Sequence, residues 1–526
     1  MSFFFLCRLN SYLFPTRGKW PLTILCRAPY NYQRGAIYPI QRPSALLSKE
    51  SSSSNKYFIT PLPQYEIYAT SQIINIKGDS EHKVYGDNLH DDGPSINAIL
   101  LKHATTPSSR CSSDKIIFFP QGIYRTLSTI YIPPGTRIAG EVFSTISGFG
   151  DFFSDASRPK PIVKMGNLDE TGVAQMSDIL VSVGDVLPGA ILVQINMAAT
   201  KPGDVGLWNC VLRVGGSHDT LVNTKCANTD PGDCKAAFAL LHVTQQASPY
   251  LEGVWGWVAD HGLDPHLNPA TNPQNIAVGR GALVESRAGT WMVGTSFEHC
   301  VLYQYALHRA AHVYIALQQT ESPYWQGAMA PHAAPAPWTV NAAYGDPTFD
   351  HCGAGGDSGL CRRAWAHYMA DSQNVVIHGS ALWVFFNGMQ DGLLADANCA
   401  STGAVCQRNL IGIDDAWSTF WFSLAAKAVD NMVYDTSGGG VNLTTQGENK
   451  GAWGGVLAAY LRDTEGPAED GGTKGGGGRG TGSGSGNSAG DGGNDETKDE
   501  DNVGAAIVPS GWGLLGITGL ALSLAF

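Results

Sequence analysis

The chain has 526 residues, of which 43% are hydrophobic and 15% charged, and its formal net charge is −12. This length accommodates two or three average domains, or one long repetitive domain with appendages. The negative balance argues against nucleic acid as a partner, because phosphate binding needs basic stripes, whereas a neutral polymer is compatible with it.

Residues 1–56 predict an irregular leader and linker. Short apolar patches alternate with arginines, and no acidic residue occurs before Glu50. A secretory signal has one unbroken apolar region and a small-residue cleavage site, which this stretch lacks, and a basic, acid-poor leader also resembles a mitochondrial transit peptide. The C-terminal sequence contradicts that destination. We therefore interpret the stretch as an imperfect or wrongly assigned start, with the native polypeptide beginning further upstream.

Residues 57–463 predict one globular domain that begins with a helix. Asp92 is placed to cap this helix and Pro94 lies in its first turn. Short apolar runs then recur at intervals of roughly twenty to thirty residues, each too short for a helical pattern and bounded by turn residues. Examples are MSDILVSV, AILVQIN, VGLWNCVLRV, AAFALLHVT, YLEGVWGW, ALVES, HVYIALQQTE and NVVIHGSALWVFF.

This spacing favours an all-β fold, a single-stranded right-handed parallel β-helix, with disordered extensions at both ends. The alternative is a β-sandwich, which would show a more regular polar alternation and hairpin turns. The early runs IIFFPQGIYRT and LSTIYIPPGTRIAGE resemble the entry coils of pectate-lyase-type proteins.

Eleven cysteines indicate an oxidising compartment, because several form close pairs around Gly- or Asp-containing loops. Metal binding is the alternative, but no pair has the spacing of a double CxxC site, so disulfides are favoured. The candidate pairs are Cys226 with Cys234, Cys352 with Cys361, and Cys399 with Cys406.

Three glutamates, Glu285, Glu298 and Glu321, lie between residues 279 and 326. Glu298 and Glu321 each precede a cluster of rings, and a carboxyl group beside apolar rings has a raised pKa. Rings also stack on pyranose faces, so the pattern predicts a sugar site; coil-end glutamates beside core aromatics are the alternative. The candidate substrate-binding residues are Tyr303, Tyr305, Tyr324, Trp325, Trp255, Trp257, Asp260 and His261.

The stretch WGWVADHGLD also contains Asp260, His261 and Asp264, which are metal-ligand types. Because no further ligand cluster is evident, a hydrogen-bonded turn that shapes the cleft wall is favoured over a metal loop. Trp383, Phe385 and Phe386 are expected in the core or at the rim of the cleft.

The C-terminal region predicts attachment to a membrane. Residues 464–502 are rich in Gly, Ser and acidic residues and form a flexible spacer, and residues 503–526 form an apolar tail. Small residues at Asn487 and Ser488, a polar spacer and a terminal apolar tail match a GPI-anchor signal, with a plain membrane anchor as the alternative. Asn442 in NLT is an N-glycosylation acceptor. Together these features predict an extracellular protein at the cell surface or cell wall.

Four motifs carry a resemblance to a known family: PYLEGVWGWVADHGLD, GRGALVES, SFEHCVLYQYAL and QTESPYWQ, in this order. They are similar to the second half of the exo-β-1,3-glucanases of glycoside hydrolase family 55, and the similarity runs from about residue 65 to about residue 460. The resemblance implies inverting exo-hydrolysis of β-1,3-glucan with release of glucose and without a cofactor. We expect no metal and a monomeric protein. The resemblance also implies that Glu321 is the general acid and that Glu298 helps to hold the attacking water.

The family has two tandem β-helix domains, and this chain corresponds to the second, so its catalytic competence is open. Two other classes of function remain. One is a non-catalytic wall protein that binds glucan or has a structural role. The other is a polysaccharide lyase, which needs a calcium-binding carboxylate cluster and a basic proton acceptor.

Overall fold

The computed structural model describes residues 40–49, 55–104, 114–227, 229–260, 274–327, 332–353, 358–385, 399, 405–436, 443–444 and 454–462. Several predicted features lie outside these residues: most of the leader, the spacer, the apolar tail, His261, Phe386, Asn442, Asn487 and Ser488. Among the described residues, no helix is long and apolar enough to cross a membrane.

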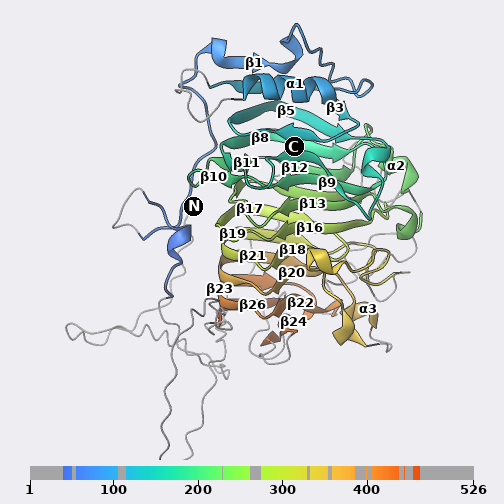
Figure 1. Cartoon of the computed structure of the whole chain (residues 1–526). Helices are drawn as coiled ribbons and strands as arrows, with labels where there is room; N and C mark the ends of the chain where they lie inside the picture. The colour runs from blue at the N-terminus through green and yellow to red at the C-terminus, as the bar shows by residue number, and fades with distance from the viewer. Residues whose placement is uncertain are drawn as a thin grey trace, which may run out of the picture.

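Short strands wind into successive coils that stack along one axis, from β1 at one end to β26 at the other (Figure 1). The first long sheet has 14 strands. These are β1 (Ile73–Asn75), β2 (Ile116–Phe119), β3 (Ile123–Thr126), β5 (Thr136–Gly148), β8 (Ala174–Val183), β11 (Val205–Trp208), β12 (Val211–Gly215), β14 (Tyr250–Glu252), β15 (Trp255–Ala259), β17 (Thr290–Glu298), β19 (Ala311–Glu321), β21 (Gln373–Trp383), β23 (Trp417–Ala426) and β26 (Gly455–Arg462).

The second long sheet has 10 strands. These are β4 (Ile130–Ile132), β6 (Lys160–Met165), β9 (Leu187–Ile195), β13 (Ala237–Val243), β16 (Val278–Val284), β18 (Tyr303–His308), β20 (Trp365–Ala370), β22 (Gln407–Asp414), β24 (Val429–Asp435) and β25 (Leu443–Thr444). A short pair, β7 (Thr171–Gly172) and β10 (Ala198–Ala199), stands apart from both sheets.

The predicted parallel β-helix is confirmed by how these strands pair. Each strand pairs in parallel with the strand one coil further along, as β17 does with β19 and β19 with β21. A sandwich of hairpins would instead give antiparallel neighbours. Among the strands of the two long sheets, antiparallel pairing occurs only in the last coil of the described chain, where β26 lies against β23 and β25 against β24. This reversal covers edges that would otherwise offer unpaired backbone groups.

The core is a stack of apolar rows, because residues at the same register in successive coils point the same way. One inward row runs from β11 to β26 and is buried throughout. Its members are Leu207, Leu251, Met292, Ile315, Ile377, Trp421 and Tyr460. Such in-register rows explain why the apolar runs of the sequence recur once per coil.

Helix α1 (Gly93–His103) lies at the β1 end of the stack and contacts β3 and β4 (Figure 1). Pro94 is in its first turn, as predicted, but the expected cap by the Asp92 side chain is wrong. That carboxylate accepts hydrogen bonds from the backbone N–H groups of Tyr85 (2.7 Å) and Gly86 (2.8 Å) and so holds the preceding loop. Two further short helices are α2 (Val222–Lys225) and α3 (Ser358–Cys361).

The three predicted disulfides are present, and they join Cys226 to Cys234, Cys352 to Cys361, and Cys399 to Cys406. Each closes a short loop between strands and therefore limits the freedom of the unfolded chain. Cys210 and Cys300 are free thiols that lie fully buried in the core.

Residues 40–49 and 55–62 cross the outer face of the first sheet and form a strap over a row of aromatic side chains. Leu46 is fully buried there, and its carbonyl accepts a hydrogen bond from the indole N–H of Trp291 (3.1 Å). Tyr57 stacks on Tyr314, with ring centroids 4.1 Å apart. The packed structure therefore begins before the predicted domain boundary at residue 57.

The segment 332–353 packs on the second sheet around a buried ion pair. Arg280 on β16 donates from Nε to Asp346 Oδ1 (2.8 Å), a second bond joins its Nη2 to Oδ2, and both side chains are buried. The same carboxylate accepts from the backbone N–H of Asn341 (2.8 Å), and the guanidinium lies 3.9 Å from the ring centroid of Phe238. One salt bridge thus fixes the segment to the sheet.

Candidate active site

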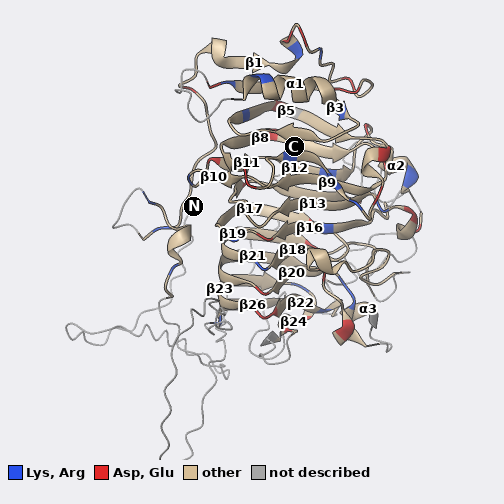
Figure 2. Ribbon diagram, in the orientation of Figure 1, with Lys and Arg blue, Asp and Glu red and all other residues tan. Residues whose placement is uncertain are grey.

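Glu298 and Glu321 lie side by side because they end two strands that pair in register. Glu298 is the last residue of β17 and Glu321 the last of β19, and the pairing aligns them directly. The same row continues to Trp257 on one side and to Trp383 on the other. Few strand residues are charged (Figure 2), and here two carboxyl groups lie directly beside each other at the ends of paired strands.

A second row lies two residues earlier on the same strands and points in the same direction. It aligns Trp255, Ser296 and Gln319. Between the two rows, Phe297 points inward and is fully buried in the core. The alternation thus sends a polar residue and a glutamate outward from each of two consecutive coils.

Glu298 is almost fully buried, and its carboxyl group makes two hydrogen bonds. The indole N–H of Trp255 donates to Oε2 (3.2 Å), and Oε1 is paired with the hydroxyl of Ser296 (2.8 Å). Burial, and then the charge of the neighbouring Glu321, raise the pKa of Glu298 to about 7 against the opposing influence of His299. A carboxyl group with this pKa carries a proton at mildly acidic pH.

Glu321 is partly exposed and is surrounded by donors. Its Oε2 accepts from the hydroxyl of Tyr324 (2.9 Å) and lies 3.4 Å from Nε2 of His299, while Oε1 faces the side-chain amide of Gln319 (3.4 Å). Donors of this kind stabilise an ionised carboxylate. The two glutamates therefore sit in contrasting surroundings although they are neighbours in one row.

His299 carries a positive charge in this arrangement. Its Nδ1 faces the carbonyl of Val258 (2.9 Å) and the carboxylate of Asp260 (3.4 Å), and its Nε2 faces Glu321. Because all three partners are acceptors, both ring nitrogens must carry hydrogen. Burial alone would lower the pKa of His299, but the charges of Asp260 and Glu321 outweigh burial and hold it well above its ordinary value.

Glu298 makes the stability of the fold depend on pH. Its pKa is raised in the folded state to about 7 from an ordinary value of about 4.3. The stabilisation is therefore fully present below about pH 4.3 and is lost as the pH rises through about 7. We expect urea unfolding of the wild type to show a fall in free energy of unfolding between pH 4.5 and 8 that is larger than that of Glu298→Gln, by on the order of 1 to 3 kcal/mol.

Glu285→Gln is the matched control, because Glu285 is also partly buried but has its pKa lowered to about 2. It is ionised throughout this window, so its substitution leaves the pH dependence between pH 4.5 and 8 intact. Equal pH slopes for the wild type and Glu298→Gln would contradict the assignment.

The structure brings some of the predicted substrate-binding residues to the glutamates. Tyr324 contacts Glu321, and Trp255 contacts Glu298. Trp257 stacks on Trp255, with ring centroids 4.8 Å apart and planes 14° apart. Asp260 is buried against His299 rather than facing a ligand.

Three predicted substrate-binding rings do not fit that role. Tyr303 and Tyr305 are fully buried on β18, in the other sheet, where Tyr305 faces the interior of the coil and Tyr303 packs under the segment 332–353. Trp325 is also buried, and its indole N–H donates to the carbonyl of Ile276 (3.1 Å). The chain turns at His299, whose φ is +66°, and this turn carries the following tyrosines away from the glutamates.

Sequence reasoning missed three residues of the site: Ser296, Gln319 and His299. A signal was present for the first two, since Ser296-Phe297-Glu298 and Gln319-Thr320-Glu321 repeat a polar residue two positions before a glutamate. In strands, residues two apart lie on one face.

The third glutamate of the stretch, Glu285, belongs to a separate cluster that follows β16. Its Oε2 accepts from Nε2 of His242 (2.8 Å) and its Oε1 from Nδ1 of His308 (3.0 Å). Burial opposes ionisation, but these two hydrogen bonds prevail and lower the pKa of Glu285 to about 2. Gln194 completes the cluster through Nδ1 of His242 (3.1 Å).

Among the described residues, no group of three or more ligand types converges on Asp260, whose carboxylate pairs with His299; His261 and Asp264 lie outside those residues. One group of ligand types does converge within the described residues, His351 with Cys352 and Cys361. Its two sulfurs are joined in a disulfide and so do not offer thiolates.

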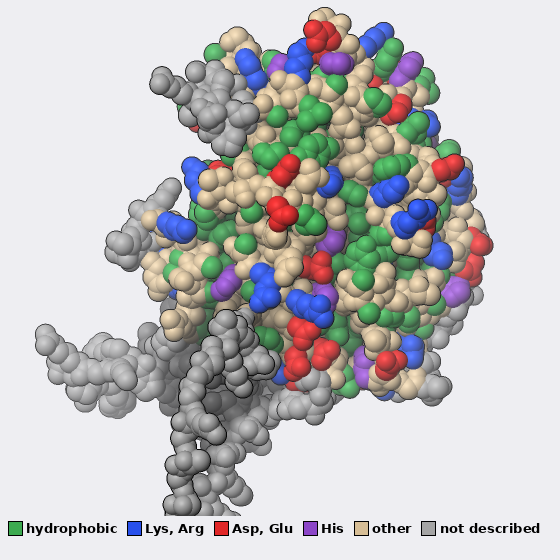
Figure 3. Space-filling model, viewed as in Figure 1, with side chains coloured by type: hydrophobic (Ala, Val, Ile, Leu, Met, Phe, Trp, Pro, Cys, Tyr) green, Lys and Arg blue, Asp and Glu red, His purple; other side chains and the backbone are tan. Residues whose placement is uncertain are grey.

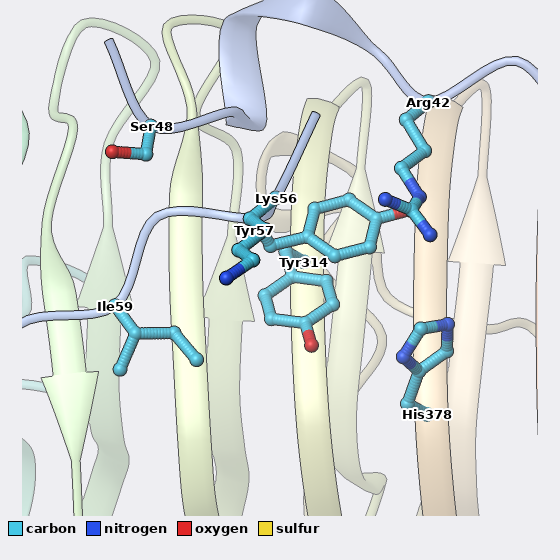
Figure 4. A pocket seen from close by; sticks show the side chains of 7 residues that line it. All are labelled: Arg42, Ser48, Lys56, Tyr57, Ile59, Tyr314 and His378. Carbon is cyan, nitrogen blue, oxygen red and sulfur yellow. The ribbon is translucent and has the colours of Figure 1, made fainter. Parts of the chain in front are cut away.

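A cavity of about 490 Å³ lies elsewhere, between the strap and the first sheet (Figure 4). Tyr57 and Tyr314 lie face to face in it, with Arg42 and His378 to one side. Tyr314 is seven residues before Glu321 on β19, or roughly 23 Å along the strand. We assign the chemistry to the glutamates, since the cavity holds no carboxyl group.

The described surface carries no basic stripe on the face seen in Figure 3, where cationic and anionic side chains are interspersed. This distribution agrees with the exclusion of nucleic acid from the net charge.

Comparison with known proteins identifies homologues over most of the chain. The glucan endo-1,3-beta-glucosidase BGN13.1 of Trichoderma harzianum is 35% identical over 428 residues, which are 80% of this chain and 53% of that protein. The glucan 1,3-beta-glucosidase of Cochliobolus carbonum is 32% identical over 442 residues, 82% of this chain and 50% of that protein. The chain thus spans about half the length of these relatives. No protein-family model matches the chain.

Among solved structures, sacteLam55A from Streptomyces sp. SirexAA-E aligns with a TM-score of 0.43 and 14% identity. The alignment covers 70% of this chain and 52% of that structure.

Proposed function

This chain is a homologue of the fungal glucan 1,3-beta-glucosidases over about four fifths of its length, and from that premise we propose that it hydrolyses β-1,3-glucan. The observation that carries the proposal is the pair of adjacent carboxyl groups in contrasting surroundings, Glu298 buried and Glu321 ringed by donors. Glycoside hydrolysis needs such a pair, one protonated to meet the leaving oxygen and one ionised to act on water or on the sugar.

Several contacts would prepare the pair for this chemistry. Trp255 and Ser296 fix the carboxyl group of Glu298, and Tyr324 and His299 fix that of Glu321, so neither has to reorient before reaction. Trp255 is partly exposed and stacks on the buried Trp257, so its ring offers an apolar wall on the coil before Glu298. A pyranose ring has apolar faces that suit such a wall.

Whether hydrolysis inverts the configuration of the anomeric carbon depends on the distance between the two carboxyl groups. Inversion, which the resemblance implies, needs the two carboxyl groups roughly 6.5–9.5 Å apart so that water fits between them. Paired strands place the Cα atoms of Glu298 and Glu321 only about 4.8 Å apart. The separation of the carboxyl groups therefore depends on divergent side chains, and a closer approach would instead favour a covalent intermediate.

The two other classes of function make different predictions. A glucan-binding wall protein would retain glucan and release nothing from it. A lyase would form unsaturated products and depend on calcium, but the described residues near Glu298 and Glu321 offer a histidinium and a tyrosine rather than a calcium cage of carboxylates.

A panel of β-glucans tests the proposal. The purified full chain is incubated with laminarin, whose backbone is β-1,3-linked, and with carboxymethylcellulose, whose backbone is β-1,4-linked. We expect new reducing ends from laminarin alone, without added calcium and without absorbance from unsaturated sugars. Laminarin that retards the protein in an affinity gel but yields no reducing ends would favour the binding protein instead.

We also propose that the protein is held at the cell surface by a GPI-type anchor. The support is the sequence after residue 463, a polar Gly-rich tract followed by an apolar tail. Treatment of intact cells with a phosphatidylinositol-specific phospholipase C is expected to release the protein. Resistance to the enzyme would point to a plain membrane anchor.

A further inference from the structure

The cavity between the strap and the first sheet is lined by two separate parts of the chain. The strap forms one wall, and strands β19 and β21 form the other (Figure 4). Its volume of about 490 Å³ lies within the range that pockets for small organic ligands have in proteins. The polar residues that line it are Arg42, Ser48, Lys56, Tyr57, Tyr314 and His378.

Each of these polar groups can donate a hydrogen bond, and none of them is acidic. Arg42 and Lys56 carry positive charge, and Ser48 and the two tyrosines offer hydroxyl groups. A neutral histidine adds one ring N–H. The chain as a whole has a net charge of −12, so a recess lined by two cations and no carboxylate is a local exception. Such a recess attracts anions.

The charges around the rings confirm that the cavity is positive. Burial raises the pKa of Tyr57 to about 12 and also raises that of Tyr314, while the charge of Arg42 opposes both shifts. Burial lowers the pKa of His378, and Arg42 lowers it further, so this ring is neutral at pH 7. Among the described residues, no carboxylate contributes to any of these three shifts.

The hydroxyl group of Tyr57 is shielded from solvent and has no hydrogen-bond partner among the described residues. The ring itself is held in place, because it stacks on Tyr314 with ring planes 13° apart and meets the ring of His378 edge-on, with centroids 5.7 Å apart. The guanidinium of Arg42 lies 5.4 Å from its centroid. An unpaired buried hydroxyl is unfavourable, and an acceptor atom of a ligand would pair with it.

The tyrosine rings are not arranged as a platform for a neutral sugar. Tyr57 and Tyr314 cover one face of each other, with centroids 4.1 Å apart, and Tyr314 is only 6% exposed. A pyranose would therefore find no open face of Tyr314 to stack on. The donors around the rings, rather than the rings themselves, determine which ligand fits.

The number of donors favours phosphate over carboxylate. A phosphate monoester carries roughly 1.5 to 2 negative charges at pH 7 and has three strong acceptor oxygens, whereas a carboxylate has one charge and two oxygens. The guanidinium of Arg42 can hold two phosphate oxygens at once, and Lys56 acts as a second point charge. The hydroxyl of Tyr57 is then available for the remaining oxygen.

We propose that this cavity binds a small organic phosphate monoester, such as a sugar phosphate, and that Arg42, Lys56 and the hydroxyl of Tyr57 hold the phosphate. The rest of the volume holds the carbon skeleton against Ile59. Because these anchors lie on the strap and the opposite wall belongs to β19 and β21, a bound ligand ties the strap to the sheet. The cavity is separate from the two glutamates, so the inference does not rest on the proposed hydrolysis of glucan.

Isothermal titration calorimetry of the full-length protein at pH 7 and low ionic strength tests the proposal. The titrants are glucose 6-phosphate, glucose, glucuronate and inorganic phosphate. We expect glucose 6-phosphate to bind at least about tenfold more tightly than each of the other three. Glucose lacks the anion, glucuronate carries a carboxylate in its place, and inorganic phosphate lacks the carbon skeleton. Added salt should weaken the binding, because part of it is electrostatic.

Three variants test the assigned contacts. Arg42→Gln is expected to weaken binding of glucose 6-phosphate by about 10- to 100-fold, because it removes charged hydrogen bonds. Tyr57→Phe keeps the ring on Tyr314 and removes only the hydroxyl, so a loss of about 3- to 10-fold is expected. Lys49→Gln is the matched control, since Lys49 is an exposed cation of the same strap that does not line the cavity. Its affinity stays at the wild-type value.

Hydrogen exchange locates the bound ligand. We expect glucose 6-phosphate to slow amide exchange in residues 40–49 and 55–62, because the ligand fixes the strap to the sheet. Exchange around Glu298 and Glu321 should not change. Protection at the glutamates without protection of the strap would mean that the sugar occupies the other site, and this result would overturn the proposal.

Other results would also contradict it. Glucose 6-phosphate that does not bind at millimolar concentration would overturn the proposal, as would equal affinities in the wild type, Arg42→Gln and Tyr57→Phe. Inorganic phosphate that binds as tightly as glucose 6-phosphate would mean that the cavity takes an ion only. Glucuronate that binds equally well would replace phosphate by carboxylate. Should Arg42→Gln fail to fold, Tyr57→Phe decides, because it leaves the packing of the strap intact.

Discussion

Glutamine in place of Glu298 or Glu321 is expected to lower kcat for laminarin hydrolysis by about 10²- to 10⁴-fold, the range that a positioned acid or base contributes. The amide keeps the size of the side chain and its contacts to Trp255 or Tyr324, but it neither gives nor takes a proton. KM should change little, because the wall formed by Trp255, which stacks on Trp257, remains. Initial rates over a range of laminarin concentrations separate the two constants.

Glu285→Gln is the control for these kinetics. It removes a carboxylate from the same stretch of sequence, but Glu285 contacts His242 and His308 and neither of the other glutamates. We expect wild-type kcat from this variant once its folding has been checked. A comparable loss in all three variants would show that the effect comes from stability rather than chemistry.

Asp346→Asn is expected to reduce the free energy of unfolding by about 3 to 5 kcal/mol, because it leaves the buried guanidinium of Arg280 without its charged partner. Nothing else among the described acidic residues contacts this guanidinium, so the charge would remain uncompensated in the core. Urea unfolding followed by tryptophan fluorescence measures the loss.

Two further variants make that result specific. Asp350→Asn changes an exposed aspartate of the same segment and should shift stability by less than about 0.5 kcal/mol. The double substitution Arg280→Met with Asp346→Leu removes both charges and should recover much of the loss, as apolar replacements of buried pairs do. A double variant as unstable as Asp346→Asn would mean that the segment is held by packing rather than by the ion pair.

The coils were predictable because each apolar run is short and ends at turn residues. MSDILVSV, AILVQIN and HVYIALQQTE all lie within strands β8, β9 and β19 or extend one by a single residue. The disulfides were predictable for a similar reason, since each pair closes a short local loop. A short window of sequence is enough to predict features whose residues lie close together in the chain.

The errors arose where distant segments meet. Tyr303 and Tyr305 follow Glu298 closely in sequence, but the turn at His299 places them on another sheet. Only the part of the strap before residue 57 is predicted as linker, because its anchor, the row of Tyr250, Trp291 and Tyr314, comes from three separate coils. No short window of sequence contains both partners of such a contact.

The candidate site lies between these cases. Sequence pattern and family resemblance identified both glutamates, and the parallel register then brought them together. The same pairing aligns Ser296 with Gln319. Sequence reasoning missed both, although each lies two residues before its glutamate. The charge on His299 depends on Val258 and Asp260 from a neighbouring coil, so it could be read only from the folded chain.

Chromatography of the products from laminarin incubated with the full chain tests the central claim most directly, with Glu298→Gln and Glu321→Gln assayed beside the wild type. The account predicts glucose or short β-1,3-linked oligosaccharides from the wild type and a loss of these products in both variants. Undegraded laminarin with the wild type, or undiminished products from either variant, would contradict the assignment of these two neighbouring glutamates as the acid and base of a β-1,3-glucan hydrolase.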